Sequence, residues 1–274
     1  MGNDDIAKHY NEIAPVTLSE RQSSKIISVR ELNNFIKAML IKKYVKKNDA
    51  VLDLGCGKGG DLTKLSFQEI SRYYGCDIAS KSLEEALNRS LYRKFKANFI
   101  CCNFTTEKIV LEEQVDLVMS QFSFHYAFST KQSLKNALKN VSTNLKQNGL
   151  FLITIPSEDV IVRRSQRGGS SFGNTMYKIE TTSPLAKKSF GQSYNFYLNE
   201  AINGCEEYLA SLEVLIEHGK KYGLVPVMNS GFLSILNQEM NADRESYHRM
   251  VKNTPTQEAI EIIELYQVVV FKKI

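Results

Sequence analysis

The chain is predicted to form one α/β domain in which helices cover both faces of a mostly parallel sheet. Three observations predict this class. From residue 50 onward, apolar runs of strand length alternate with segments of helix length. A glycine-rich turn, GCGKGG at 55–60, follows the first run, and YQVVVFKKI at 266–274 supplies a closing strand. Repeated strand–helix–strand units form parallel sheets with helices on both faces.

The elements of the first half follow in chain order. An amphipathic helix is predicted over 29–45, with one apolar face formed by Leu32, Phe35, Ile36, Met39 and Leu40. Strands are then predicted at 50–55, 73–78, 98–103 and 115–122. The helices that connect them are predicted at about 60–66, 80–95 and 130–145.

The second half breaks this alternation after a fifth strand at 150–156. The basic, Gly- and Ser-rich stretch 163–174 is predicted to be a mobile loop. The whole segment 158–210 is predicted to be an insert, because runs such as SYNFYLN at 193–199 favour burial. A helix at about 210–222 and strands at 224–228 and 265–274 complete the predicted sheet.

The composition is that of an ordinary soluble globular protein, with 43% hydrophobic and 24% charged residues. The formal net charge of +5 leaves room for a local basic site that attracts a polyanion. The five cysteines and four histidines lack the spacing of metal ligands, so no metal site is expected. Neither a signal-peptide core nor an apolar run of about 18 residues is present, which predicts an intracellular protein without a membrane span.

The glycine turn carries the first chemical signal. Gly55, Gly57 and Gly60 satisfy G-x-G-x-x-G between a predicted strand and helix, and Asp77 follows about 20 residues later at the end of the next strand. This arrangement lets a ligand approach bare backbone at a helix N-terminus while a carboxylate accepts hydrogen bonds from a ribose diol. Both nicotinamide dinucleotides and S-adenosylmethionine use such a loop.

Three details favour S-adenosylmethionine. Asp53, separated from the loop by one residue, places a carboxylate where a methionine ammonium group would lie and where a pyrophosphate would be repelled. Lys58, inside the loop, suits a second and anionic ligand. The closing strand at 266–274 is typical of the seven-stranded methyltransferase sheet. These features predict a methyltransferase.

Further motifs carry a resemblance to a family. With GCGKGGD at 55–61, the segments NNFIK at 33–37 and SQFSFHYAF at 120–128 resemble the eukaryotic mRNA cap guanine-N7 methyltransferases, most closely the compact fungal and microsporidian type. The resemblance extends from HYN at 9–11 to the last strand. It implies a Rossmann-like seven-stranded sheet with an antiparallel last strand, and a single domain over 1–274. N-terminal helices within 1–48 would complete the cofactor and cap sites, and the insert 158–210 would contribute to the cap pocket.

The resemblance implies a set of cofactor residues: Lys37, Asp53, Gly55, Asp77, Asn103, Gln121 and Tyr126. Lys37 would contact the cofactor's carboxylate, Asp77 would hold the ribose hydroxyls, and Gln121 and Tyr126 would touch the methionine end. The family places an acid at the position of Asn103, near the adenine amino group. The amide carbonyl oxygen can still accept that hydrogen bond, so binding is expected to survive.

The resemblance also implies a set of cap residues: Asn33, Asn34, Lys58, Lys64, Arg89, His125, Glu207 and Tyr266. Asn33 and Asn34 would contact RNA. The three cations would meet the phosphate bridge or ribose of the cap, where charge-assisted contacts are strong and salt-sensitive. His125 and Glu207 would form the guanine pocket, with Glu207 chosen over the adjacent Glu206 by the match to CEEY at 205–208, and Tyr266 would be a cap-contacting aromatic at the start of the last strand.

The implied reaction is methyl transfer from S-adenosylmethionine to guanine N7 of GpppN-capped RNA, by in-line attack. N7 presents a lone pair and no proton, so neither a general base nor a metal is required. No residue is therefore expected to act as a chemical catalyst. Positioning and electrostatics would come from Lys37, Asp77, His125, Tyr126 and Glu207.

Other functions stay open on the residues alone. A methyltransferase for a small anionic metabolite would share the cofactor residues, a dinucleotide oxidoreductase only the glycine loop, and an RNA-binding module only the basic residues. The family resemblance further implies a nuclear protein that binds capped RNA and works with other capping enzymes or RNA polymerase II.

Overall fold

The computed structural model describes residues 11, 23–186 and 190–274. Its main feature is a seven-stranded sheet in the order β10-β11-β5-β4-β1-β2-β3. All strands run parallel except β11, which is antiparallel to both of its neighbours. The predicted fold class and antiparallel last strand are therefore confirmed. The strands are β1 Ala50–Leu54, β2 Arg72–Asp77, β3 Lys96–Cys101, β4 Val115–Gln121, β5 Leu145–Pro156, β10 Leu224–Gly231 and β11 Tyr266–Lys273.

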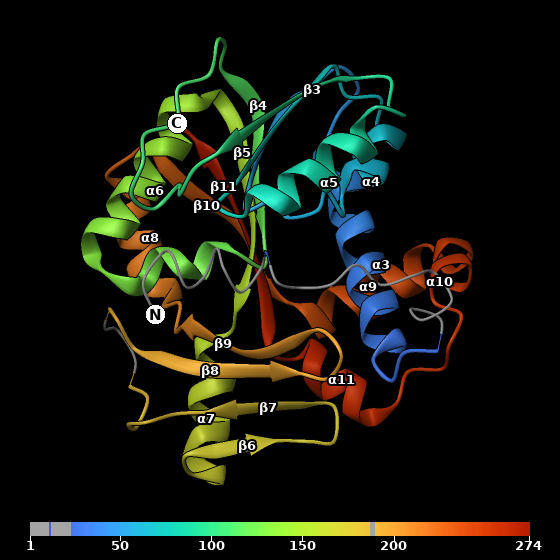
Figure 1. The fold of residues 1–274 in the computed structure, drawn as a ribbon, viewed down its shortest axis with the longest axis vertical. Helices are drawn as coiled ribbons and strands as arrows, with labels where there is room; N and C mark the ends of the chain where they lie inside the picture. The colour runs from blue at the N-terminus through green and yellow to red at the C-terminus, as the bar shows by residue number, and fades with distance from the viewer. Residues whose placement is uncertain (1–10, 12–22, 187–189) are drawn as a thin grey trace.

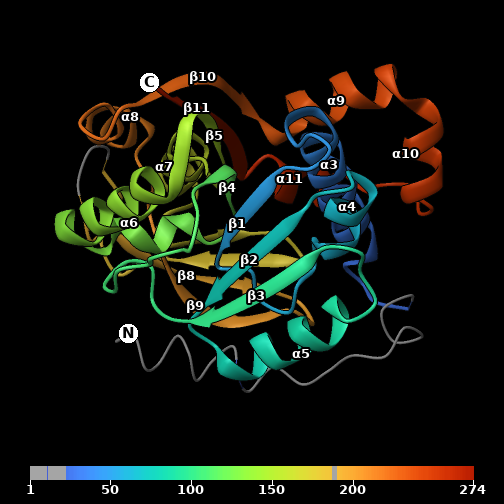
Figure 2. The same ribbon diagram turned by 90° about the horizontal axis from the view of Figure 1, so that it is seen from above.

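Helices cover both faces of this sheet, as Figures 1 and 2 show. On one face lie α3 (Ile27–Tyr44), α4 (Leu62–Phe67) and α5 (Ser80–Ser90). On the other lie α6 (Lys131–Asn144) and α8 (Leu212–Lys220). The five apolar residues predicted for the first helix are all buried in α3. Each face therefore has its own hydrophobic core, which fixes the sheet between two helical layers.

The segment after β5 forms a second, antiparallel sheet below the first (Figure 1). Its strands are β6 Ser171–Gly173, β7 Tyr177–Glu180, β8 Ser193–Leu198 and β9 Ile202–Tyr208. Phe196 and Cys205 are buried opposite each other on β8 and β9. The last strand, β9, lies against η1 (Phe124–Ser129), the short 3₁₀ helix that follows β4. The second sheet therefore reaches the carboxyl edge of the first.

The prediction of a mobile loop at 163–174 is wrong. Residues Glu158–Gly168 form helix α7, which carries two carboxylates in its first turn and buries Ile161 and Val162. Arg164 donates to the Glu264 carboxylate at 2.6 Å. The acidic residues at the helix start, the apolar face and this ion pair stabilise the helix. Its basic composition led to the prediction of a loop. The predicted helix at 80–95 also ends early, at Ser90.

Three short helices after β10 have no counterpart among the predicted elements: α9 Phe232–Ala242, α10 Arg244–Met250 and α11 Gln257–Ile263. They pack against α3, for example through the rings of Phe35 and Tyr247 at 5.3 Å. Two of them begin at side chains that cap the helix, Asp243 and Thr256. Together these helices cover part of α3, the helix that contributes Lys37 to the site.

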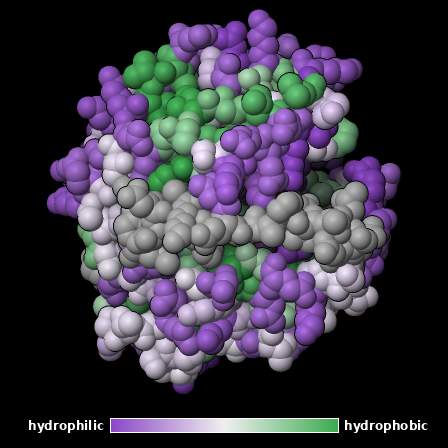
Figure 3. Space-filling view, viewed as in Figure 1, coloured by the Kyte–Doolittle hydropathy of each residue, from purple (hydrophilic) through white to green (hydrophobic). Residues whose placement is uncertain are grey.

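The predicted N-terminal helices before residue 23, and the HY pair at 9–10, lie outside the described residues. On the face drawn in Figure 3, hydrophilic side chains cover most of the surface, and the hydrophobic ones gather mainly in the upper half. Within the described ranges, every helix is too short or too polar to cross a bilayer.

Candidate active site

A cavity of about 570 Å³ opens at the carboxyl ends of β1, β2 and β4. In parallel α/β sheets, ligands bind at this edge, where the loops diverge. The cavity is lined by all seven residues expected to bind the cofactor: Lys37, Asp53, Gly55, Asp77, Asn103, Gln121 and Tyr126. They come from α3, from strands β1, β2 and β4, from the loops after β1 and β3, and from η1, and the fold brings them into one space.

The glycine loop contains backbone conformations that residues with a side chain rarely adopt. Gly55 and Gly57 have φ of +75° and +51°, and a Cβ at Gly55 would collide with the side chain of Ser123. Asp77 holds the loop, because its Oδ2 accepts from the Gly57 N–H at 2.8 Å and its Oδ1 from the Ala79 N–H at 2.9 Å. Burial raises the pKa of Asp77, although these backbone donors oppose the shift. Asp77 is therefore a structural part of the loop as well as a candidate ribose ligand.

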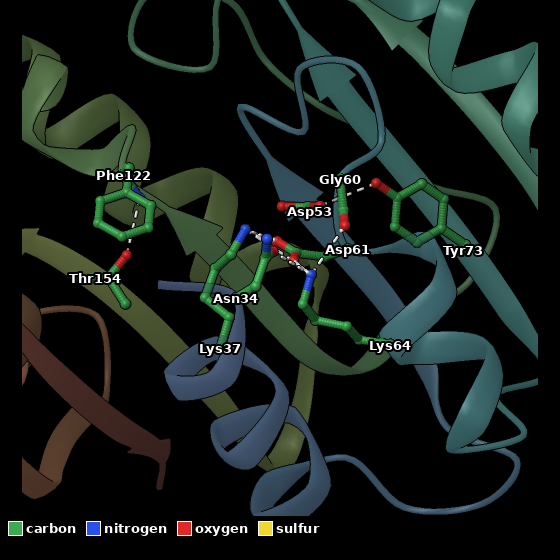
Figure 4. A network of polar contacts seen from close by, with 9 residues as sticks. All are labelled: Asn34, Lys37, Asp53, Gly60, Asp61, Lys64, Tyr73, Phe122 and Thr154. Atoms are coloured by element: carbon green, nitrogen blue, oxygen red, sulfur yellow. Dashed lines mark hydrogen bonds and ion pairs between the residues drawn. The ribbon is translucent and has the colours of Figure 1, made fainter. Parts of the chain in front are cut away.

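Asp61 is a site residue that was not among those predicted from the sequence. Its Oδ1 lies 2.8 Å from the Nζ of both Lys37 and Lys64 (Figure 4). Burial alone would raise the pKa of Asp61, but the two cations outweigh it and lower the pKa to about 2. Lys64 also donates to Asn34 Oδ1 at 3.0 Å. The carboxylate at the start of α4, within the GCGKGGD motif itself, was the available signal.

Two buried side chains that line the cavity carry polar atoms without a partner among the described residues. These are Asp53 Oδ1 and both amide atoms of Gln121. Buried polar atoms in folded proteins are nearly always hydrogen-bonded. Both side chains therefore have polar atoms that can bind a ligand.

The residue that follows β4 in the cavity wall, Phe122, has a left-handed backbone conformation. Phe122 has φ of 61°, and its N–H donates to the Thr154 carbonyl at 3.1 Å and to the Thr154 hydroxyl at 2.9 Å. Successive residues of a strand point to opposite faces. Because the chain turns at Phe122, the consecutive residues Gln121, Phe122 and Ser123 all line the cavity.

Asn103 lines the cavity, but its carbonyl oxygen is already engaged. Its Oδ1 accepts from the Thr105 N–H at 2.9 Å and from the Thr105 hydroxyl at 2.7 Å. Two lone pairs therefore have two donors. An adenine amino group could use this oxygen only after Thr105 released it.

A second cluster lies beside the cavity and contains three of the expected cap residues. Glu207 on β9 accepts from the Tyr194 hydroxyl at 2.9 Å, and its other oxygen lies 3.9 Å from His125 Nε2. The His125 ring packs on Tyr126, and Tyr266 packs edge-on against Phe122 at 4.8 Å. Tyr126 and Phe122 both line the cavity, so the two sites are contiguous.

The protonation states in this cluster are set by burial. Burial raises the pKa of Glu207 to about 7, although the Tyr194 hydroxyl opposes the shift. Burial lowers the pKa of His125 to about 3, so its ring is neutral at physiological pH. Both ring nitrogens of His125 lack a hydrogen-bond partner within the described part of the chain. A neutral imidazole thus faces a carboxylate that ionises near pH 7.

Two of the three expected phosphate-binding cations, Lys58 and Arg89, are joined through one carboxylate. Lys58 Nζ lies 2.7 Å from Glu85, and Arg89 lies 3.5 Å from the other oxygen of the same carboxylate. Lys64 pairs with Asp61 instead. Asn33 lies on α3 next to Asn34, and its Oδ1 is buried without a partner in the described ranges. None of the expected phosphate- and RNA-contacting residues lines the cavity, although Asp61, the partner of Lys64, does.

Candidate metal ligands do not gather anywhere in residues 11, 23–186 and 190–274, where no three His, Cys, Asp or Glu side chains lie close enough to hold an ion. The expectation from the sequence that methyl transfer requires no metal stays a prediction.

The sequence matches the model of one protein family, the mRNA (guanine-N(7))-methyltransferase domain, over residues 2–274. A Drosophila melanogaster mRNA cap guanine-N(7) methyltransferase is 35% identical over 89% of this chain. The Schizosaccharomyces pombe protein of the same name is 34% identical over 88%, and a Cryptococcus neoformans one 33% over 86%. The chain spans 64%, 71% and 36% of the length of these three relatives.

Solved structures with the same fold are more distant in sequence. A methyltransferase from Clostridium acetobutylicum, described as S-adenosylmethionine-dependent, aligns with a TM-score of 0.56 at 17% identity, over 98% of each chain. The CcbJ methyltransferase of Streptomyces caelestis aligns with a TM-score of 0.60 at 12% identity, over 88% of this chain and 89% of that one. At these identities the likeness shows the fold alone.

Proposed function

The chain belongs to the mRNA (guanine-N7)-methyltransferase family, and we propose that it transfers a methyl group from S-adenosylmethionine to guanine N7 of GpppN-capped RNA. One observation carries the proposal. The cavity lined by the seven expected cofactor residues adjoins the buried pair of His125 and Glu207 expected for guanine. A cofactor pocket beside a purine pocket is what this reaction requires.

The cavity fits S-adenosylmethionine in size and chemistry. Its volume of about 570 Å³ is typical of small-molecule sites. The unpartnered oxygen of Asp53 suits the cofactor's ammonium group. The Lys37 ammonium group suits the cofactor's carboxylate, although Lys37 would then bind both that carboxylate and Asp61. Added side chains at Gly57 and Gly60 would meet nothing within 4 Å, so the loop presents open backbone. Bound there, the cofactor supplies an electrophilic methyl group.

The guanine would be held by Glu207 and His125. The Glu207 carboxylate can accept from N1–H and the exocyclic amine of guanine, and the Tyr194 hydroxyl fixes the rotamer of that carboxylate. The neutral His125 adds no positive charge beside a base that becomes cationic during the reaction. An anion and a neutral ring therefore form a field that favours the transition state.

No residue has to remove a proton, because guanine N7 presents a lone pair and no hydrogen. The chain's task is to hold N7 in line with the methyl group, and such positioning can supply much of the rate enhancement. No Lewis acid is needed to activate the nucleophile either. Methyl transfer is therefore expected to continue in excess EDTA.

The test is incubation of the protein with radiolabelled S-adenosylmethionine and several acceptors. Label in 7-methylguanosine after incubation with GpppN-capped RNA, with or without EDTA, is the expected result. Label in a small anionic metabolite but not in capped RNA would support the alternative methyltransferase. Absence of transfer to either acceptor would contradict the proposal.

The same family membership supports two proposals about cellular context. Capped RNA, which arises on nuclear transcripts, would reach the protein in the nucleus. Other capping enzymes or RNA polymerase II would deliver it. Immunoprecipitation of the tagged chain from nuclear and cytoplasmic fractions tests both statements.

A further inference from the structure

The carboxyl group of Asp53 is held asymmetrically. Its Oδ2 accepts from the Tyr73 hydroxyl at 2.9 Å, whereas its Oδ1 has no partner among the described residues (Figure 4). Asp53 lies on β1, is 2% exposed and lines the cavity. One oxygen is thus committed to the protein interior and the other is left for a ligand.

The strand register explains why Tyr73 reaches this carboxylate. Asp53 on β1 lies opposite Gly75 on β2, and Tyr73 precedes Gly75 by two residues, so its side chain lies on the same face of the sheet. A Cβ at Gly75 would lie 2.9 Å from the rings of Tyr73 and Phe99. The glycine therefore clears the space through which the phenol approaches Asp53.

Tyr73 is completely buried and its ring is fixed on two sides. The rings of Phe95 and Phe99 lie 6.0 and 5.8 Å away. A buried phenol needs a hydrogen-bond acceptor, and the Asp53 carboxylate provides it. Because its neighbours immobilise the ring, the phenol can hold the carboxylate in one orientation.

The charged environment of Asp53 makes its ionisation sensitive to this bond. Burial, and after it the Asp61 carboxylate, raises the pKa of Asp53 to about 8. The Tyr73 hydroxyl and the Lys37 ammonium oppose the rise, and Asp77 adds to it. The buried thiol of Cys56 contacts the Tyr73 hydroxyl and lies near the same carboxylate. Among these groups, only the phenol is seen to donate directly to Asp53.

We propose that Tyr73 is a positioning residue for the cofactor's ammonium group, acting through Asp53. By occupying Oδ2, the phenol turns Oδ1 toward the cavity and favours the charged carboxylate that an ammonium ion requires. The inference rests on the proposed function, since it takes S-adenosylmethionine as the ligand. It adds a residue that contacts neither cofactor nor cap.

The test compares Tyr73→Phe with Tyr74→Phe by calorimetry. Tyr74 is the next residue of β2, is equally buried, and contributes to the core on the opposite face of the sheet. Each variant is titrated with S-adenosylhomocysteine, which carries the amino-acid group, and with 5′-methylthioadenosine, which lacks it. Tyr73→Phe should weaken S-adenosylhomocysteine about tenfold and leave 5′-methylthioadenosine unchanged. Tyr74→Phe should change neither affinity.

The pH dependence gives a readout that a structural role would not move. Affinity for S-adenosylhomocysteine should rise with pH as Asp53 ionises. In Tyr73→Phe this rise should move to higher pH, because the variant loses a bond that favours the carboxylate. Gly75→Ala keeps the phenol but crowds its ring, and should reproduce part of the selective loss if Tyr73→Phe does not fold.

Three results would overturn the inference. They are an equal loss for both ligands, an unchanged affinity for S-adenosylhomocysteine in Tyr73→Phe and Gly75→Ala, and a pH profile that does not move. A wild-type protein that binds neither ligand would instead remove the proposed function, and with it the premise of the inference.

Discussion

The cofactor cavity lies along the carboxyl edge of one sheet, whereas the expected cap residues come from four helices, a loop and one strand of each sheet. Two polar groups of the cavity also differ from the three cations on the cap side in how they are satisfied. In the cavity, Asp53 Oδ1 and the Gln121 amide lack partners in the described part of the chain. On the cap side, Lys58, Lys64 and Arg89 already pair with Glu85 or Asp61.

This difference indicates how the cofactor and the cap would each bind. The cavity is preformed, so a cofactor would gain hydrogen bonds without displacing any from Asp53 or Gln121. A cap triphosphate would have to compete with carboxylates for each cation. The partly exposed ion pairs of Lys58 and Arg89 with Glu85 are individually weak, whereas the Lys64–Asp61 pair is nearly buried. Substitutions in the cavity are therefore expected to have larger effects than substitutions among the cations.

The largest effect is expected for Asp77→Asn. The side chain would lose its charge and one of the acceptors that hold Gly57 and Ala79, so both the ribose site and the loop would suffer. Calorimetry should show S-adenosylmethionine affinity falling by roughly a hundredfold, about 2.7 kcal/mol. The exposed carboxylate Glu112, changed to Gln, serves as the control. Normal affinity in Asp77→Asn would contradict the cofactor assignment.

The next effect is expected at Glu207, on the cap side but buried like the cavity residues. Guanine protons become more acidic as the methyl group arrives, so hydrogen bonds to the carboxylate strengthen toward the transition state. Glu207→Gln should lower kcat at least about tenfold, or 1.4 kcal/mol, with a smaller change in KM. A normal kcat with a raised KM would leave Glu207 a binding residue only.

The same variant should change the pH profile. Since burial raises the Glu207 pKa to about 7, the wild-type rate should rise with pH through that value as the carboxylate ionises. Glu207→Gln should lack this rise, and a profile identical to wild type would assign it to another group.

Asp53→Asn should separate binding from stability. The folded pKa of about 8 lies above the ordinary 3.8, so the carboxyl group stabilises the ligand-free fold at low pH and this contribution is lost as pH rises toward 8. The amide avoids that loss. Tm should therefore increase above pH 8 and change little near pH 4, while cofactor affinity falls. A Tm decrease at alkaline pH would show that the charge is well compensated.

The smallest effects are expected among the cations, where a matched pair of variants is available. Lys58→Ala should weaken GpppG more than guanosine and reduce the salt slope by at most about one unit. Glu85→Gln removes the carboxylate that competes for Lys58 and Arg89, and should lower the KM for GpppG by about twofold to threefold. Equal losses for GpppG and guanosine in Lys58→Ala would place its effect in the fold.

The sheet and the cofactor residues Asp53, Gly55 and Asp77 could be predicted because their signals are local. The other cofactor residues, Lys37, Asn103, Gln121 and Tyr126, came only from the family resemblance. A glycine turn between a strand and a helix, with Asp77 at the next strand end, determines where the chain meets a ligand. The pairing of His125 with Glu207 depended on family resemblance, since His125 lies on η1 after β4 and Glu207 lies on β9 of the second sheet. Helix α7 was missed because its composition is basic, although Ile161 and Val162 form its buried face.

The left-handed turn at Phe122 and the Tyr73–Asp53 bond could not be predicted at all. Both depend on contacts between strands whose register no local pattern specifies. Asp61 was visible in its motif, but its role follows only from the approach of Lys37 on α3. Residues were thus recognised more readily than the partners that orient them.

The most direct test of this account is a crystal structure with S-adenosylhomocysteine and GpppG bound together. The account predicts the ammonium group at Asp53 Oδ1, the ribose at Asp77, and the guanine between His125 and Glu207, with N7 facing the sulfur. The triphosphate should displace Glu85 from Lys58 and Arg89. A guanine bound away from Glu207, or a cofactor whose ammonium group does not meet Asp53, would contradict it.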